Sequence, residues 1–144
     1  MGHVMVLFLS SSSQSLTVVP FVCDTVDAWA RSGEGAAAAQ RAESLLRQMN
    51  KLYNAGGHDA LRPTTENFNA VIFAWTGCNE KVAPRRAEQI LIRMRQLRDV
   101  EVQPDKFICN TVIRAWARIG GLDAAINAQR FLTSMHQMYE KGNL

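Results

Sequence analysis

The sequence of 144 residues predicts an all-α fold built from tandem pairs of helices, and three observations favour it. The stretch Asn69–Trp75 recurs without gaps as Asn110–Trp116 and, in a degenerate form, as Cys23–Trp29. The tryptophans that end the three copies lie 46 and 41 residues apart. Apolar residues recur at helical spacing, and no segment alternates as a β-strand does. A period of this size is typical of stacked repeats, in which neighbouring units cover each other's apolar faces.

The first unit, residues 19–64, is predicted to hold a pair of helices. Pro20 suits the first turn of the first helix, where a missing backbone N–H does no harm. Gly33 ends that helix, because glycine tolerates the left-handed conformation of a C-terminal cap. A second helix is predicted over residues 36–53, and its polar side carries Arg41, Glu43, Arg47 and Lys51.

The second unit, residues 65–105, repeats this pattern. Thr64 or Thr65 is predicted to cap its first helix, which ends at a break over residues 77–81. Proline is common in the first turn of a helix, and a helix over residues 84–98 is therefore predicted to follow.

The third unit, residues 106–144, is predicted to begin with a helix capped by Asp105. The pair at residues 120–121, both glycine, breaks this helix, and residues 122–123 lead into the last one. The unit lacks its closing residues. Residues 1–18 do not match the repeat, and we interpret them as a partial preceding repeat or a frayed end.

Composition excludes several classes of protein. A formal net charge of +3 permits a polyanionic partner without demanding one. The three cysteines are an odd number without CxxC spacing, and the three histidines lie far apart, so no disulfide framework, metal site or cofactor is expected. All three thiols are interpreted as reduced and intracellular. The apolar run at residues 4–9 is too short to cross a membrane, so no membrane association is expected.

The repeated tracts resemble the pentatricopeptide repeat family over Pro63–Trp75 and Pro104–Arg118, and in the second helices over Arg41–Met49 and Arg86–Met94. The resemblance extends from about residue 19 to 144. It implies a right-handed α-solenoid of about three repeats that binds single-stranded RNA, one base per repeat.

The resemblance also implies which residues read the bases. In the family, a polar residue at the end of the first helical turn contacts the base edge together with the last residue of the same repeat. The matching pairs are Asn69 with Asp105, Cys23 with Thr64, and Asn110 with a partner beyond Leu144. By similarity the first pair favours uridine, whereas a thiol is a poor hydrogen-bonding group and departs from the pattern.

The family places a small apolar residue near the helix start to wedge between bases, and the matching positions are Pro20, Glu66 and Phe107. Glu66 departs from this pattern. A basic residue near the end of the first helix often meets phosphate, and Arg31 and Arg118 match. The alternative for each arginine is a solvated charge that favours the helix dipole. The alternative for the asparagines is a hydrogen bond inside the repeat.

The sequence is compatible with two kinds of binding function. The first is a non-catalytic RNA-binding module, either a monomer or a fragment of a longer array. The second is a scaffold for protein partners, similar to tetratricopeptide repeats. An enzyme is not expected, because no nucleophile–base pair, phosphate loop or metal spacing occurs. The resemblance implies RNA processing, stability or translation in a mitochondrion or plastid, which residues 1–18 do not confirm because they lack arginine.

Overall fold

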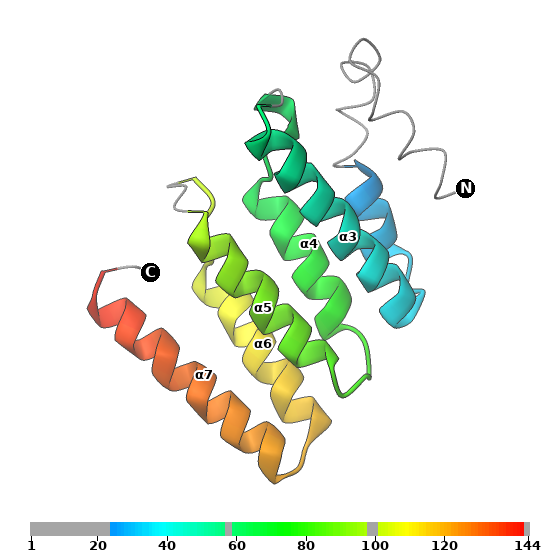
Figure 1. Cartoon of the computed structure of the whole chain (residues 1–144). Coiled ribbons are helices and arrows are strands. Elements are labelled where there is room, and N and C mark those ends of the chain that lie inside the picture. The colour runs from blue at the N-terminus through cyan, green and yellow to red at the C-terminus, as the bar shows by residue number, and fades with distance from the viewer. Residues whose placement is uncertain (1–23, 57–58, 98–100, 143–144) are drawn as a thin grey trace.

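A computed structural model describes residues 24–56, 59–97 and 101–142 (Figure 1). Residues 24–31 are helical, and the elements that follow are α3 (Gly35–Asn54), the short 3-10 helix η1 (Asp59–Leu61), α4 (Thr65–Thr76), α5 (Ala83–Gln96), α6 (Lys106–Ile119) and α7 (Leu122–Glu140). No strand occurs in these ranges, which confirms the predicted all-α class for the described part of the chain. The predictions for residues 1–18, Pro20 and Cys23 lie outside it.

The starts of α4 and α6 are fixed by side-chain caps, as the sequence predicts. The Thr64 hydroxyl accepts a hydrogen bond from the backbone N–H of Asn67 at 3.3 Å, and the Asn67 side chain accepts one from the backbone N–H of Thr64 at 3.0 Å. The Asp105 carboxylate accepts a hydrogen bond from the N–H of Ile108 at 2.7 Å. Such caps stabilise a helix by about 0.5–2 kcal/mol, so they place α4 and α6 at the predicted unit starts.

The turn between α6 and α7 depends on glycine. Gly120 and Gly121 have φ angles of 74° and 85°, and both ψ angles are extended. This region of backbone space is essentially restricted to glycine. The pair therefore lets α7 begin after only two intervening residues, and α7 folds back to pack against α6.

The helices lie in two layers. In Figure 1, α3, α5 and α7 lie in front, and α4 and α6 lie behind them. Contacts between elements agree, because α4 packs against α3, α5 and α6, and α6 packs against α5 and α7. Between the layers lies one apolar core, whose fully buried members include Met49, Val71, Ile72, Trp75, Ile90, Leu91, Met94 and Val112. Each large side chain buried there stabilises the fold by about 1.5–3 kcal/mol.

Glu43 was predicted on the polar side of α3, and that prediction is wrong. Its side chain is only 6% exposed, and its Oε2 accepts a hydrogen bond from Trp75 Nε1 at 3.0 Å. Its Oε1 lies 2.9 Å from Arg47, 3.3 Å from Arg93 and 3.7 Å from Arg86. A buried carboxylate is stable only when it is paired and hydrogen-bonded. We call these five side chains the Glu43 cluster, and they join α3, α4 and α5.

The next interface along the chain, which involves α5, α6 and α7, repeats only part of this arrangement. Glu88 on α5 holds the same place in the tract Arg-Ala-Glu as Glu43 on α3. It pairs with Arg130 of α7 at 3.0 Å. Trp116 holds the place of Trp75, yet its buried Nε1 has no hydrogen-bond partner among the described residues. The two tryptophans are thus similar in burial and unlike in polar contacts.

This difference predicts unequal costs for the same substitution. Trp75→Phe removes the donor that Glu43 accepts from, whereas Trp116→Phe removes a donor that is already unpaired. Leaving a buried polar group unsatisfied costs about 1–3 kcal/mol. We expect Trp75→Phe to destabilise the protein more than Trp116→Phe by about that amount in urea unfolding. Each variant is the control for the other, and equal midpoints would contradict the expectation.

Candidate nucleic-acid interface

A groove of about 590 Å³ lies between the helical residues 24–31 and α4. It is lined by Asp27, Ala30, Arg31, Glu66, Asn69, Ala70 and Phe73. Three residues that the sequence assigns to different roles therefore share one groove: the predicted base reader Asn69, the predicted phosphate contact Arg31, and the wedge position Glu66. Helical spacing along α4 explains why Glu66 and Asn69 line the same groove, because residues three and four apart lie on one face of a helix.

Asn69 is the polar centre of this groove. The residue is half-buried, and its Oδ1 is buried with no hydrogen-bond partner in the described part of the chain. Because that oxygen is closed off from solvent, the group that Asn69 offers to the groove is its amide nitrogen, which is a hydrogen-bond donor. The edge of uracil has carbonyl oxygens that accept such a bond.

Asp105 and Thr64 both serve as helix caps. Capping occupies one of the two Asp105 oxygens, and a carboxylate can accept about four hydrogen bonds in all. The Thr64 hydroxyl both accepts from the N–H of Asn67 and donates to the Asn67 Oδ1, at 3.0 Å. Thr64 also borders a second groove of about 420 Å³, and Glu66 lines both grooves.

Phe107 and Phe73 form an exposed aromatic pair between α6 and α4. Their rings are tilted at 53°, with centroids 5.8 Å apart, and the side chains are 64% and 42% exposed. Phe107 was predicted as a wedge position, whereas no role was predicted for Phe73. The aligned copies contain the missed signal, because a position that holds Asp27 and Arg114 in the other units is not a core position.

Asn110 is exposed and lines a groove of about 310 Å³ between α6 and α7. Lys106 and Tyr139 line the same groove, and the Lys106 ammonium lies 4.8 Å from the centre of the Tyr139 ring. The partner predicted beyond Leu144 lies outside the described residues.

The two predicted phosphate contacts differ in their surroundings. Arg31 is exposed and lines the groove beside Asn69. Arg118 is exposed, and its guanidinium donates a hydrogen bond to the carbonyl of Thr76, at the C-terminal end of α4. Carbonyl groups there have no partner inside the helix. A guanidinium carries five N–H donors, so this cap occupies only part of Arg118.

Charge is distributed unevenly over the surface formed by residues 24–31, α4 and α6. Acids dominate the groove beside Asn69, where Asp27 and Glu66 accompany Arg31. The exposed charges on α6 are basic, namely Lys106, Arg114 and Arg118. A polyanion is therefore attracted to α6 more strongly than to the groove itself.

The described cysteines, Cys78 and Cys109, are free and buried. Burial raises the pKa of Cys109 to about 11, and the Asp105 carboxylate adds to the rise. Burial also raises the pKa of Cys78, and Glu80 acts in the same direction. Both thiols are therefore protonated at neutral pH, which is the unreactive form. They pack as small apolar side chains.

Comparison with protein-family models, with curated proteins and with solved structures finds no match for the chain. None of the helices in the described ranges is both long enough and apolar enough to cross a bilayer. Among the same residues, no three His, Cys, Asp or Glu side chains gather as a metal site requires.

Proposed function

We propose that this chain is a non-catalytic module that binds single-stranded RNA, one base per repeat. In this proposal the helix pairs form a right-handed α-solenoid of about three repeats, and α4 and α6 line the RNA path. The RNA would be processed, stabilised or translated in a mitochondrion or plastid. The observation that carries the proposal is the Asn69 side chain, which lines one groove with Arg31 and Phe73.

The arrangement supplies each component that such binding needs. Asn69 offers a hydrogen-bonding amide to a base edge, and the pair Phe73 and Phe107 offers exposed ring faces. Stacking of a base on an aromatic ring contributes about 1–3 kcal/mol and tolerates any sequence. The exposed cations of α6, namely Lys106, Arg114 and Arg118, contact the phosphates of the RNA backbone. Recognition by hydrogen bonds, stacking and charge is the usual mode for single-stranded RNA.

The test is a titration of labelled ten-nucleotide RNAs against the protein at low salt, followed by fluorescence anisotropy. We expect oligouridine to bind, with an affinity that falls as salt rises by a slope of about 0.7 per phosphate contacted. Asn69→Ala is expected to weaken oligouridine binding about tenfold and to reduce the preference for uridine, because one base contact is lost.

Asn79→Ala is the matched control, since Asn79 is an exposed asparagine in the turn after α4. It should bind RNA as the unchanged protein does. A folded protein that binds none of the RNAs contradicts the proposed function. Equal effects of the two substitutions contradict the role of Asn69.

A further inference from the structure

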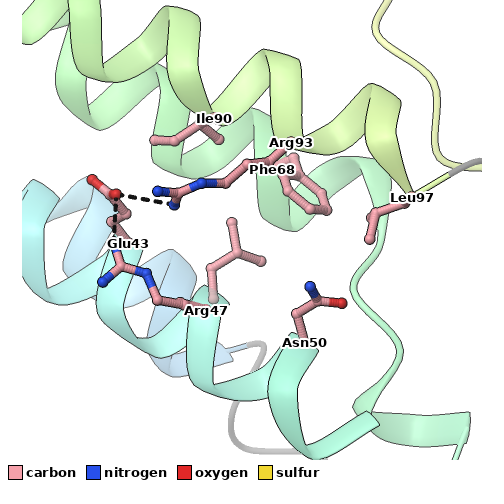
Figure 2. Close-up of a pocket in the computed structure, with 8 residues that line it drawn as sticks. Glu43, Arg47, Asn50, Phe68, Ile90, Arg93 and Leu97 are labelled. Carbon is pink, nitrogen blue, oxygen red and sulfur yellow. Dashed lines mark hydrogen bonds and ion pairs between the residues drawn. The ribbon is translucent and has the colours of Figure 1, made fainter. Parts of the chain in front are cut away.

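A second pocket lies between α3, α4 and α5 and shares no lining residue with the groove beside Asn69 (Figure 2). Its volume is about 290 Å³. Its lining residues are Glu43, Leu46, Arg47, Asn50, Phe68, Ile90, Arg93 and Leu97. This is the lower end of the size range of ligand pockets, and it suits one or two amino-acid residues better than a nucleotide chain.

The walls of the pocket are apolar. Leu46, Phe68 and Ile90 are at most 4% exposed, and Leu97 at the end of α5 is half-buried. Phe68 therefore presents no free ring face on which a base could stack. An aliphatic or aromatic side chain placed here would lose water contact against these walls, which is favourable at about 25 cal/mol per Å².

Opposite ends of the pocket carry different polar groups. Figure 2 shows Glu43 with the guanidinium groups of Arg47 and Arg93 at one end, and Asn50 at the other. The Oδ1 of Asn50 is buried and has no hydrogen-bond partner within the described ranges. Because that oxygen is closed off from solvent, the atom that Asn50 offers to a ligand is its amide nitrogen (Figure 2), which can donate to a peptide carbonyl.

The charged end has an excess of cations. Arg47 and Arg93 line it together with the single Glu43 carboxylate, so its lining carries a charge of +1, and Glu43 is also shared with Arg86, which lies outside the lining. The Arg47 and Arg93 side chains are 58% and 46% exposed. Each guanidinium has five donors, and Glu43 uses only part of them. A second carboxylate is therefore complementary to this end of the pocket.

We propose that this pocket binds a peptide segment of a partner protein in which an acidic residue adjoins an apolar one. The acidic side chain pairs with Arg47 and Arg93, the apolar side chain fills the space between Leu46 and Phe68, and the Asn50 amide nitrogen donates to a peptide carbonyl. Phosphate alone would leave the apolar walls and the amide without contacts, so a nucleic acid is the less complementary occupant.

The test uses labelled nonapeptides with Gly-Ser flanks, in which a central Asp precedes Leu, Val or Phe, and a second set with Asn in place of Asp. We expect at least one Asp peptide to bind saturably at low salt in fluorescence anisotropy. Its Asn counterpart should bind about tenfold more weakly, because the charge-assisted contact is lost. Failure of all three Asp peptides against folded protein overturns the proposal.

Arg47→Gln should weaken the binding of the best peptide about tenfold. The matched control is Arg130→Gln, which removes a similarly exposed arginine from the equivalent glutamate of the next interface. Circular dichroism establishes that both variants are folded. Equal peptide affinities of the two variants overturn the proposal, as does displacement of the peptide by oligouridine. Asn69→Ala should leave peptide binding intact, so the result does not depend on the proposed RNA function.

Discussion

Replacing Glu43 by alanine is expected to destabilise the protein by about 2–3 kcal/mol. Leaving the buried indole N–H of Trp75 unpaired costs about 1–3 kcal/mol, and the contacts with the half-exposed arginines add the smaller contribution of screened ion pairs. The carboxylate is 6% exposed, accepts the indole N–H of Trp75, and neutralises part of the charge of three arginines. Without it, the indole donor is buried and unpaired, and the guanidinium groups of Arg86 and Arg93 repel each other. Urea unfolding followed by tryptophan fluorescence and circular dichroism measures the loss.

Glu88→Ala is the matched control for this substitution. Glu88 occupies the same position of the repeat, but among the described residues it pairs with Arg130 alone, and that arginine is 63% exposed. Solvent screens such a contact, so a loss of about 1 kcal/mol is expected. Similar losses for the two variants would show that the Glu43 cluster has no special role in stability.

Phe107→Ala is expected to reduce RNA affinity about tenfold, because stacking on an aromatic ring contributes about 1–3 kcal/mol per base. The side chain is 64% exposed, so the substitution should change the free energy of unfolding by less than about 0.5 kcal/mol. A loss of RNA affinity without a loss of stability would identify Phe107 as a contact for RNA and not for folding. The measurement is the same oligouridine titration, combined with urea unfolding.

Ile92→Ala provides the control for loss of exposed apolar surface. Ile92 is 42% exposed and lies on α5, in the layer opposite α4 and α6. It should leave RNA affinity unchanged. If Phe107→Ala also leaves it unchanged, the aromatic pair is not part of the RNA path.

Local patterns predicted the helices well. Asp105 caps α6 as expected, and Thr64 rather than Thr65 caps α4. These features depend on neighbours in the chain, which a sequence displays directly. Glu43 was misplaced because its partners Trp75 and Arg93 are 32 and 50 residues away. A charge at helical spacing looks solvated until the helix packed against it is known.

The roles predicted for the candidate interface remain predictions, but the position of several of its residues in the fold could be predicted. The repeat placed Asn69, Phe107 and Arg31 on first helices, and the structure brings Asn69 and Arg31 into one groove. The engagement of Arg118 with the end of α4 could not be foreseen, since it depends on the approach of α4 to α6. The pocket beside Asn50 was missed for the same reason, because three helices contribute to it.

The uneven interfaces of the chain have a consequence for cooperativity. The Glu43 cluster couples α3, α4 and α5 into one unit. The ion pair between α7 and α5 is formed by the exposed Arg130. The indole N–H of Trp116, on α6, has no polar partner within the described chain. In stacked repeats, the free energy of opening varies from unit to unit. We therefore expect the α6–α7 pair to open at lower cost than the unit that the Glu43 cluster holds together. Because Phe107 and Asn110 belong to this pair, the proposed binding of RNA to them would shift its opening equilibrium towards the closed state.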